Sequence, residues 1–200
     1  MSAKGYLYFL INKPYDILSQ FSDEGLNKGL GSIYSLPTDV YPVGRLDMDS
    51  EGLLILTNDR ALNSRLLNPE MLHTRTYWVE VEGVPTTTQL RELEMGVEIS
   101  LKKGTYKTNP CEAKIMHPAP QMDERTPPVN RKKYPITTWL EIRLTEGKNR
   151  QVRKMTAKIG HPTLRLVRVA IEDVRLGNLP SGGITQISKK VLYKKLKITD

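Results

Sequence analysis

The sequence predicts an α+β fold, with a mixed and mostly antiparallel central sheet flanked by short helices. Several runs alternate apolar and polar residues, as half-buried strands do, and helical periodicity is confined to short segments. Strands and helices intermingle without the strict alternation that would indicate a parallel α/β sheet. With 200 residues, 38% of them hydrophobic, the chain can bury one core, or two lobes that share a sheet, without disulfides or metals.

Composition favours a polyanionic partner and an intracellular, cytoplasmic protein. The 30 Lys and Arg outnumber the 22 Asp and Glu, which gives a net charge of +8. A single cysteine, Cys111, excludes an intrachain disulfide, and the three histidines show no metal-site spacing. The apolar stretch at residues 6–11 is too short for a membrane span and lacks a signal-peptide cleavage site, so we interpret it as the first strand.

The first strand should end before Pro14, because proline removes a backbone donor, and a glycine-rich loop follows it. Apolar runs at residues 40–43 and 53–57 enclose a turn, and the second run has the continuous apolar character of a strand buried on both faces. The Asn-Asp pair at residues 58–59 can cap a short helix that stops before Pro69.

Residues 76–83 alternate as a half-buried strand should. One face carries Tyr77, Val79 and Val81, and the other carries Trp78, Glu80 and Glu82. A capping box at residues 86–89 opens a helix that stops at Gly96. From about 102 to 135, six prolines among polar residues predict an irregular excursion.

Regular structure resumes with an alternating strand at residues 138–144. A helix follows from about 149 to 159, with Gly160 as its C-terminal cap. The apolar face of this helix is formed by Val152, Met155 and Ile159.

The last part of the chain contains an extended run at residues 163–171, a turn rich in glycine and proline, and a short strand near 184–187. No internal repeat is present. We therefore predict a single domain over residues 1–188, followed by a lysine-rich basic tail at 189–200.

Residues 44–52 are the most informative stretch, because they pack three acids and an arginine into a glycine-bounded turn between two apolar runs. A carboxylate at the edge of a core is partly desolvated and seeks a cationic or hydrogen-bonding partner. The spacing alone leaves three interpretations open. They are a catalytic carboxylate, an ordinary surface turn, and a magnesium site formed by Asp47, Asp49 and Glu51, as in a metal-dependent nuclease.

Residues 146–155 form a basic segment at the start of a predicted helix. Arg150 and Lys154 are four apart and share a face, and Arg153 lies beside Arg150 one turn on. These side chains are candidates for binding an RNA backbone, and a solvated charged face is the alternative.

Three segments together carry a family resemblance: residues 44–59, 76–83 and 146–155. In this order and at these separations they resemble the RsuA branch of pseudouridine synthases, and within it the short type that acts on large-subunit ribosomal RNA. The agreement extends from Leu7 to about Ile187. The resemblance implies the pseudouridine synthase fold, with two sub-lobes around an active-site cleft, and conversion of a ribosomal RNA uridine to pseudouridine, with 23S RNA as the expected substrate.

The resemblance also implies residue roles. Asp47 matches the essential aspartate, which attacks the flipped uridine while the N1–C1′ bond breaks, the base turns and a C5–C1′ bond forms. Tyr77 matches the tyrosine that packs against the target base, although its register with two valines also suits a core residue. Arg153 matches the arginine that pairs with the aspartate, and Arg45 would position Asp47 or the RNA. Lys13 either lies near phosphate or only marks the end of the first strand.

Physical chemistry fits these roles. A carboxylate in a site that excludes water keeps its charge when a guanidinium lies beside it. A base inside an RNA helix has to flip out at a cost on the order of a few kcal/mol, which stacking on an aromatic ring partly offsets. The reaction is an internal rearrangement, so no cofactor and no metal are expected.

Two features depart from the usual pattern of the branch. The chain has no room for the S4-type RNA-binding domain that often precedes the first strand, so we expect the catalytic domain, the 102–135 excursion and the basic tail to supply RNA affinity. Lys148 and Lys154 stand where relatives commonly have arginine, and a lysine cannot form the bidentate contacts of an arginine.

We expect a monomer, because the basic surfaces suit RNA better than a partner subunit. A ribosome-assembly factor that binds RNA without modifying it is the alternative function.

Overall fold

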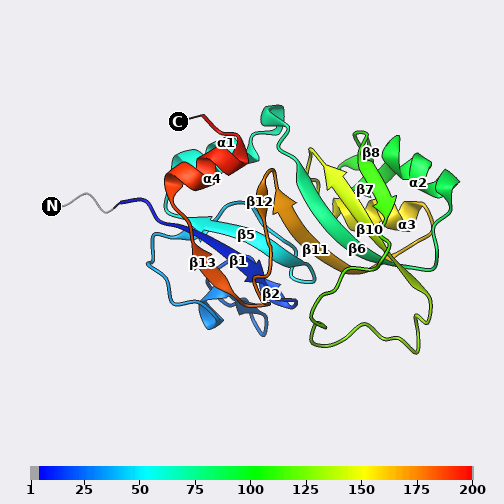
Figure 1. Ribbon diagram of the computed structural model, residues 1–200, viewed down its shortest axis with the longest axis horizontal. Coiled ribbons are helices and arrows are strands. Elements are labelled where there is room, and N and C mark those ends of the chain that lie inside the picture. Colours follow the sequence, from blue (N-terminus) through cyan, green and yellow to red (C-terminus); the bar gives the residue numbers. More distant parts are fainter. Residues whose placement is uncertain (1–4, 200) are drawn as a thin grey trace. The chain divides into compact units, whose positions relative to one another are not determined.

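The computed structural model describes residues 5–199 and divides into two compact units (Figure 1). The first unit comprises Met1–His73 and Arg168–Asp200, and the second comprises Thr74–Val167. Each unit has its own cluster of buried apolar side chains. Both units combine strands with short helices, which confirms the predicted α+β class.

In the first unit the strand order is β13-β1-β5-β11. Strand β1 (Tyr8–Lys13) pairs antiparallel with β13 (Ile184–Gln186) and with β5 (Glu51–Thr57), and β11 spans Thr163–Ile171. All seven residues of β5 are buried, as the continuous apolar run predicted. Strand β1 begins two residues later than expected and ends, as expected, before Pro14.

Short strands complete the first unit. They are β2 (Ile17–Leu18), β3 (Lys28–Gly29), β4 (Tyr41–Pro42) and β12 (Val174–Arg175). Strand β2 pairs with β3 in parallel, β4 pairs with β5, and β12 pairs with β11. The glycine-rich loop expected after β1 therefore contains a small sheet of its own.

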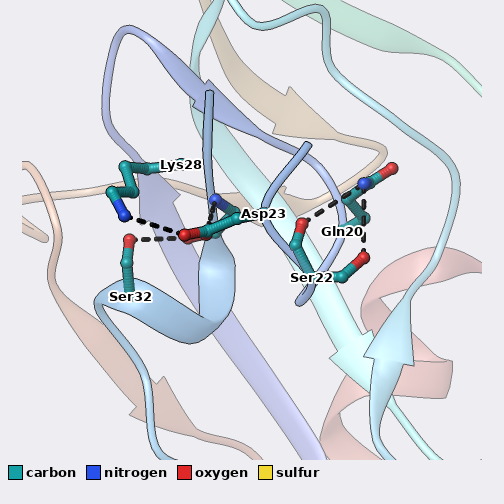
Figure 2. A network of polar contacts seen from close by, with 6 residues as sticks. Gln20, Ser22, Asp23, Lys28 and Ser32 are labelled. Atoms are coloured by element: carbon teal, nitrogen blue, oxygen red, sulfur yellow. Dashed lines mark hydrogen bonds and ion pairs between the residues drawn. The ribbon is translucent and has the colours of Figure 1, made fainter. Parts of the chain in front are cut away.

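The loop between β2 and β3 is fixed by its own polar contacts (Figure 2). The carboxylate of Asp23 accepts hydrogen bonds from the Gly29 amide at 2.9 Å and from the Lys28 ammonium at 2.8 Å. A Cβ at Gly29 would lie 2.4 Å from the carbonyl oxygen of Ser22, so the turn requires glycine there. The segment is thus an ordered turn and not a loose connection.

Two helices cover the first unit, α1 (Arg60–Leu67) and α4 (Lys189–Leu196). Asp59 caps α1 through the amides of the first turn, as predicted. The lysine-rich segment is not a separate tail, because it forms α4 and packs into the core of this unit. The buried residues of α4 are Leu192, Tyr193 and Leu196, whose spacing gives a short apolar stripe.

In the second unit the strand order is β11-β6-β10-β9. Strand β6 (Arg75–Glu82) pairs antiparallel with β10 (Thr137–Leu144) along its whole length, and β10 pairs with β9 (Glu112–Ile115). A separate hairpin is formed by β7 (Glu98–Leu101) and β8 (Gly104–Lys107).

The predicted irregular excursion is too long. Strands β8 and β9 lie inside residues 102–135, and the longest continuous stretch without helix or strand among the described residues is 116–136. The prolines at 110 and 118 flank β9 without interrupting it, which is compatible with a short edge strand.

Glu80 lies on the face of β6 opposite the valines but does not face solvent. Its side chain is buried, and its carboxylate binds the guanidinium of Arg131 and accepts a hydrogen bond from the Thr137 hydroxyl at 2.8 Å. Buried charges persist when they are paired and hydrogen-bonded. The pairing also attaches the 116–136 segment to β6.

The helices of the second unit are α2 (Thr87–Glu94) and α3 (Gln151–Lys158). The capping box of Thr86 and Gln89 is present in α2. Helix α3 begins two residues later than predicted, but its apolar face is buried as expected: Val152, Met155 and Ile159. No helix among residues 5–199 has the length and apolar character needed to cross a membrane.

Candidate active site

Asp47 lies in a turn between β4 and β5 whose backbone is fixed on both sides. The Asp47 carbonyl accepts a hydrogen bond from the Ser50 amide at 3.0 Å, which closes the turn. On the preceding side, the Ser19 hydroxyl donates to the Leu46 carbonyl at 2.7 Å and accepts from the Leu46 amide at 3.0 Å. Asp47 itself is half-buried, so a residue with a fixed backbone remains partly accessible.

The glycines that bound this turn are required by its conformation. Gly44 has φ 70° and Gly52 has φ 104°, both in the region that favours glycine. A Cβ at Gly44 would also lie 3.0 Å from a methyl group of Leu67 on α1. The glycine-bounded turn seen in the sequence is therefore a shaped structure against the core of the first unit.

Lys13 lies beneath the Asp47 turn and is completely buried. Its ammonium donates hydrogen bonds to the carbonyl oxygens of Pro14 at 2.7 Å, Ile17 at 2.7 Å and Met48 at 3.3 Å. These three bonds use all the donors of an ammonium group. This geometry favours a positioning role for Lys13, in which it ties the end of β1 to the Asp47 turn, and does not leave it exposed for phosphate.

Burial lowers the pKa of the Lys13 ammonium to about 8. Four carboxylates oppose this effect, in decreasing order Glu51, Asp49, Asp16 and Asp47. The lysine therefore supplies buried positive charge among the acids of the turn. Among residues 5–199, no group of three or more His, Cys, Asp or Glu side chains is arranged to hold a metal ion.

Tyr77 lies on β6 in the second unit and is half-buried against the apolar core of that unit. It stands opposite Ile142 of β10, on the face that carries the valines, as the alternation predicted. Its neighbour Trp78 faces the other way and donates to the Glu141 carboxylate at 3.2 Å.

Arg153 lies in the first half of α3 and is half-buried. One of its guanidinium nitrogens donates to the carbonyl of Thr163 at the start of β11, at 3.4 Å. Lys154 is half-buried and Arg150 is exposed, whereas Arg45 is exposed beside the Asp47 turn. The candidates thus divide between the units, with Asp47, Arg45 and Lys13 in the first and Tyr77, Arg150, Arg153 and Lys154 in the second.

Residues 7–158 match the family model described as RNA pseudouridylate synthase. The match covers most of the chain and includes every candidate residue from Lys13 to Lys154. The chain belongs to this family. This pseudouridine synthase is 52% identical over 171 residues to the ribosomal large subunit pseudouridine synthase E of Xanthomonas axonopodis, covering 85% of this chain and 88% of the relative. It is 49% identical to the enzyme of the same name from Vibrio parahaemolyticus, covering 86% of this chain and 70% of the relative.

Solved structures agree on the fold. A crystal structure of a pseudouridylate synthase matches with a TM-score of 0.77 and 23% identity, covering 98% of this chain and 76% of the other. The human RNA pseudouridylate synthase domain containing 1 matches with a TM-score of 0.56 and 11% identity, covering 98% and 94%. These likenesses confirm the predicted pseudouridine synthase fold.

Sequence reasoning missed the polar groups that hold the candidate residues in place. Ser19, Glu146 and Gln151 were given no role, although each makes contacts at a segment that carries a candidate residue. A signal was present for Gln151, because this polar residue falls four positions before the buried Met155 and beside Val152 on the predicted apolar face. A buried amide requires hydrogen-bonding partners, which would have directed attention to Glu146.

Proposed function

We propose that this pseudouridine synthase converts a specific uridine of large-subunit ribosomal RNA to pseudouridine, with Asp47 as its catalytic carboxylate. The observation that carries the proposal is the Asp47 turn, in which a half-buried carboxylate is held by bonded backbone on both sides. The names of relatives at about half identity supply the substrate class.

In the proposed reaction, Asp47 acts on a uridine that has been flipped out of the RNA. The N1–C1′ glycosidic bond breaks, the uracil turns, and a C5–C1′ bond forms, after which the proton on C5 is lost and N1 gains a proton. The product is an isomer of the substrate, so the step needs no oxidant, no nucleotide and no metal. A fixed carboxylate suits this chemistry, because orientation of the reacting groups lowers the barrier without any movement at the moment of reaction.

We assign Tyr77 to packing against the target base and Arg153 to electrostatic support of the reaction. Arg45, Arg150 and Lys154 are assigned to RNA positioning. The charge distribution supports an RNA partner, since Thr74–Val167 contains 17 Lys and Arg against 10 Asp and Glu. We expect the enzyme to act as a cytoplasmic monomer.

The test is pseudouridine formation on protein-free 23S and 16S ribosomal RNA, mapped by carbodiimide modification and primer extension. Asp47→Asn keeps the shape of the side chain and removes its charge. Loss of the catalytic carboxylate should lower the rate on the order of 10⁴-fold or more, while RNA binding is retained. Asp173→Asn is the matched control, because Asp173 is an exposed aspartate of the same unit, and it should react like the wild type.

Each outcome decides between functions. One modified uridine in 23S RNA, absent with Asp47→Asn, supports the proposal and identifies the substrate. RNA binding by the wild type without modification of any ribosomal RNA, including assembling subunits, would favour the assembly factor. Strand cleavage that EDTA abolishes would favour the nuclease.

A further inference from the structure

The carboxylate of Glu146 is the centre of a hydrogen-bond network just before α3. One oxygen accepts a bond from the Tyr106 hydroxyl of β8 at 2.6 Å. The other accepts bonds from the Asn109 amide at 2.8 Å and from the side-chain amide of Gln151 at 2.7 Å. Bonds to a charged acceptor are stronger than neutral ones, so this half-buried group joins β8, the segment after β8 and the first residue of α3 firmly.

Gln151 extends this network back into the loop. Its side chain is buried, and while its nitrogen donates to Glu146 its oxygen accepts a hydrogen bond from the Lys148 amide at 2.8 Å. The Gln151 amide in turn donates to the Lys148 carbonyl at 3.1 Å. The Lys148 ammonium lies 4.8 Å from the ring centre of Tyr106. The loop of residues 146–150 is therefore closed by side chains at both ends.

The loop needs this support because its own backbone does not favour a helix start. Arg150 at the N-cap position has φ 52° and ψ 34°, a left-handed conformation that costs a non-glycine residue about 1–2 kcal/mol. The side chain of Arg150 makes no capping hydrogen bond to the first turn of α3, and that turn contains no acidic residue. The start of α3 is therefore fixed neither by an N-cap side chain nor by an acidic residue in the first turn, and the hydrogen bonds of Glu146 and Gln151 supply this support.

We infer that Glu146 is a positioning residue for pseudouridine formation: through Gln151 it fixes the first turn of α3 and so the direction of Arg153. This inference rests on the proposed function and on the role assigned to Arg153 there. Arg153 is two residues beyond Gln151 in the same turn, so a rotation of that turn moves its guanidinium. Glu146 itself touches only protein groups in the contacts described above and is not assigned to RNA binding.

Glu146→Gln is the informative variant. The glutamine amide nitrogen cannot accept the bond from the Tyr106 hydroxyl, and one charged acceptor is lost. Since a misplacement of about 1 Å can cost on the order of 100-fold in rate, we expect kcat to fall roughly 10- to 100-fold, with the KM for RNA within about threefold of wild type. Tyr106→Phe removes one bond and keeps the ring under Lys148, so its loss of kcat should be smaller.

Glu112→Gln is the matched control. Glu112 is also a glutamate of the second unit, but its side chain is 74% exposed and is paired at the surface with Arg143, so the kcat should not change. Ile99→Val, a small truncation in the core of the same unit, provides a structural comparison. If Ile99→Val lowers Tm as much as Glu146→Gln and keeps its kcat, loss of stability does not explain the loss of rate.

Three results would overturn the inference. They are an unchanged kcat in Glu146→Gln, a loss confined to KM, and a loss of kcat that Ile99→Val reproduces at equal Tm. A wild-type protein that forms no pseudouridine would overturn the proposed function itself and this inference with it. The wild-type reaction distinguishes that failure from a failure of Glu146 alone.

Discussion

Replacing Lys13 by methionine should destabilise the first unit and slow the reaction without removing an RNA contact. Methionine has a similar length and no donor, so the carbonyls of Pro14, Ile17 and Met48 all lose the bond from the ammonium, although Met48 keeps its bond from the Asp16 amide. Each bond to a charged group contributes about 1.5–3 kcal/mol, but the variant also avoids the cost of burying an ammonium. We expect a net loss of about 2–4 kcal/mol, which for a chain of this size lowers Tm by roughly 5–15 °C.

The assay combines thermal unfolding at pH 7 with pseudouridine kinetics and RNA binding well below the lower Tm. Lys28→Met is the control, because Lys28 is an exposed lysine of the same unit whose ammonium is paired with Asp23. Positioning by Lys13 requires a lower Tm and a lower kcat, with RNA affinity close to that of the control. A variant of unchanged Tm that binds RNA more weakly than the control would refute this reasoning and assign Lys13 to phosphate contact.

Three further predictions concern Lys13, Cys111 and the lysines of α4. Burial lowers the pKa of Lys13 to about 8 in the folded protein, whereas in the unfolded chain it stays near 10.5, so between these values the unfolded state binds more protons. The unfolding free energy of the wild type, relative to that of Lys13→Met, should therefore rise from pH 8 to pH 10.5 by up to about 3 kcal/mol, as measured in urea titrations. Burial raises the pKa of the Cys111 thiol to about 12, so iodoacetamide at pH 8 should label the native protein far more slowly than the urea-unfolded chain; equal rates would contradict this. We expect Lys190 and Lys194 of α4 to contact phosphate, so the double variant Lys190→Gln/Lys194→Gln should reduce the slope of log K for RNA binding against log salt by about 1.4–1.8. Lys197→Gln is the control and should leave the slope unchanged, because the Lys197 ammonium is already ion-paired. A double variant with the same slope as the wild type would show that the RNA does not contact these two lysines.

Local pattern was sufficient to predict the elements whose formation depends on nearby residues. The buried run of β5, the Asp59 cap of α1, the capping box of α2 and the apolar face of α3 all follow from spacings within one or two turns or strands. Each was confirmed. The family motifs added the fold and the candidate site, which periodicity alone left open among three interpretations.

The features that local pattern did not predict depended on partners far away in the sequence. Alternation placed Glu80 on the face opposite the valines of β6 but could not show that it is buried, because its partner Arg131 lies 51 residues later. The buried contacts of Lys13 were not predicted either, because one of its three acceptors, Met48, lies 35 residues away. The lysines of residues 189–195 led us to predict a basic tail, although Leu192, Tyr193 and Leu196 form an apolar stripe that is buried in α4. Composition describes the preference of a side chain in water and cannot describe a partner that only folding provides.

The two buried polar networks answer the same physical problem. The Asp47 turn and the loop before α3 both contain residues with positive φ, at Gly44 and Arg150, so regular hydrogen-bonded structure cannot hold their backbone. A charged side chain that bonds several groups at once can tie such a segment to its neighbours: Lys13 joins Met48 of the Asp47 turn to the end of β1 through carbonyl oxygens, and Glu146 joins α3 to β8 through donors. The charges are opposite because the groups bonded in the first network are carbonyl acceptors and those bonded in the second are donors. An exchange of the charged group for a neutral side chain of similar size should therefore loosen a segment that carries a proposed site residue before it unfolds a unit, so activity should be lost at temperatures where both cores remain folded.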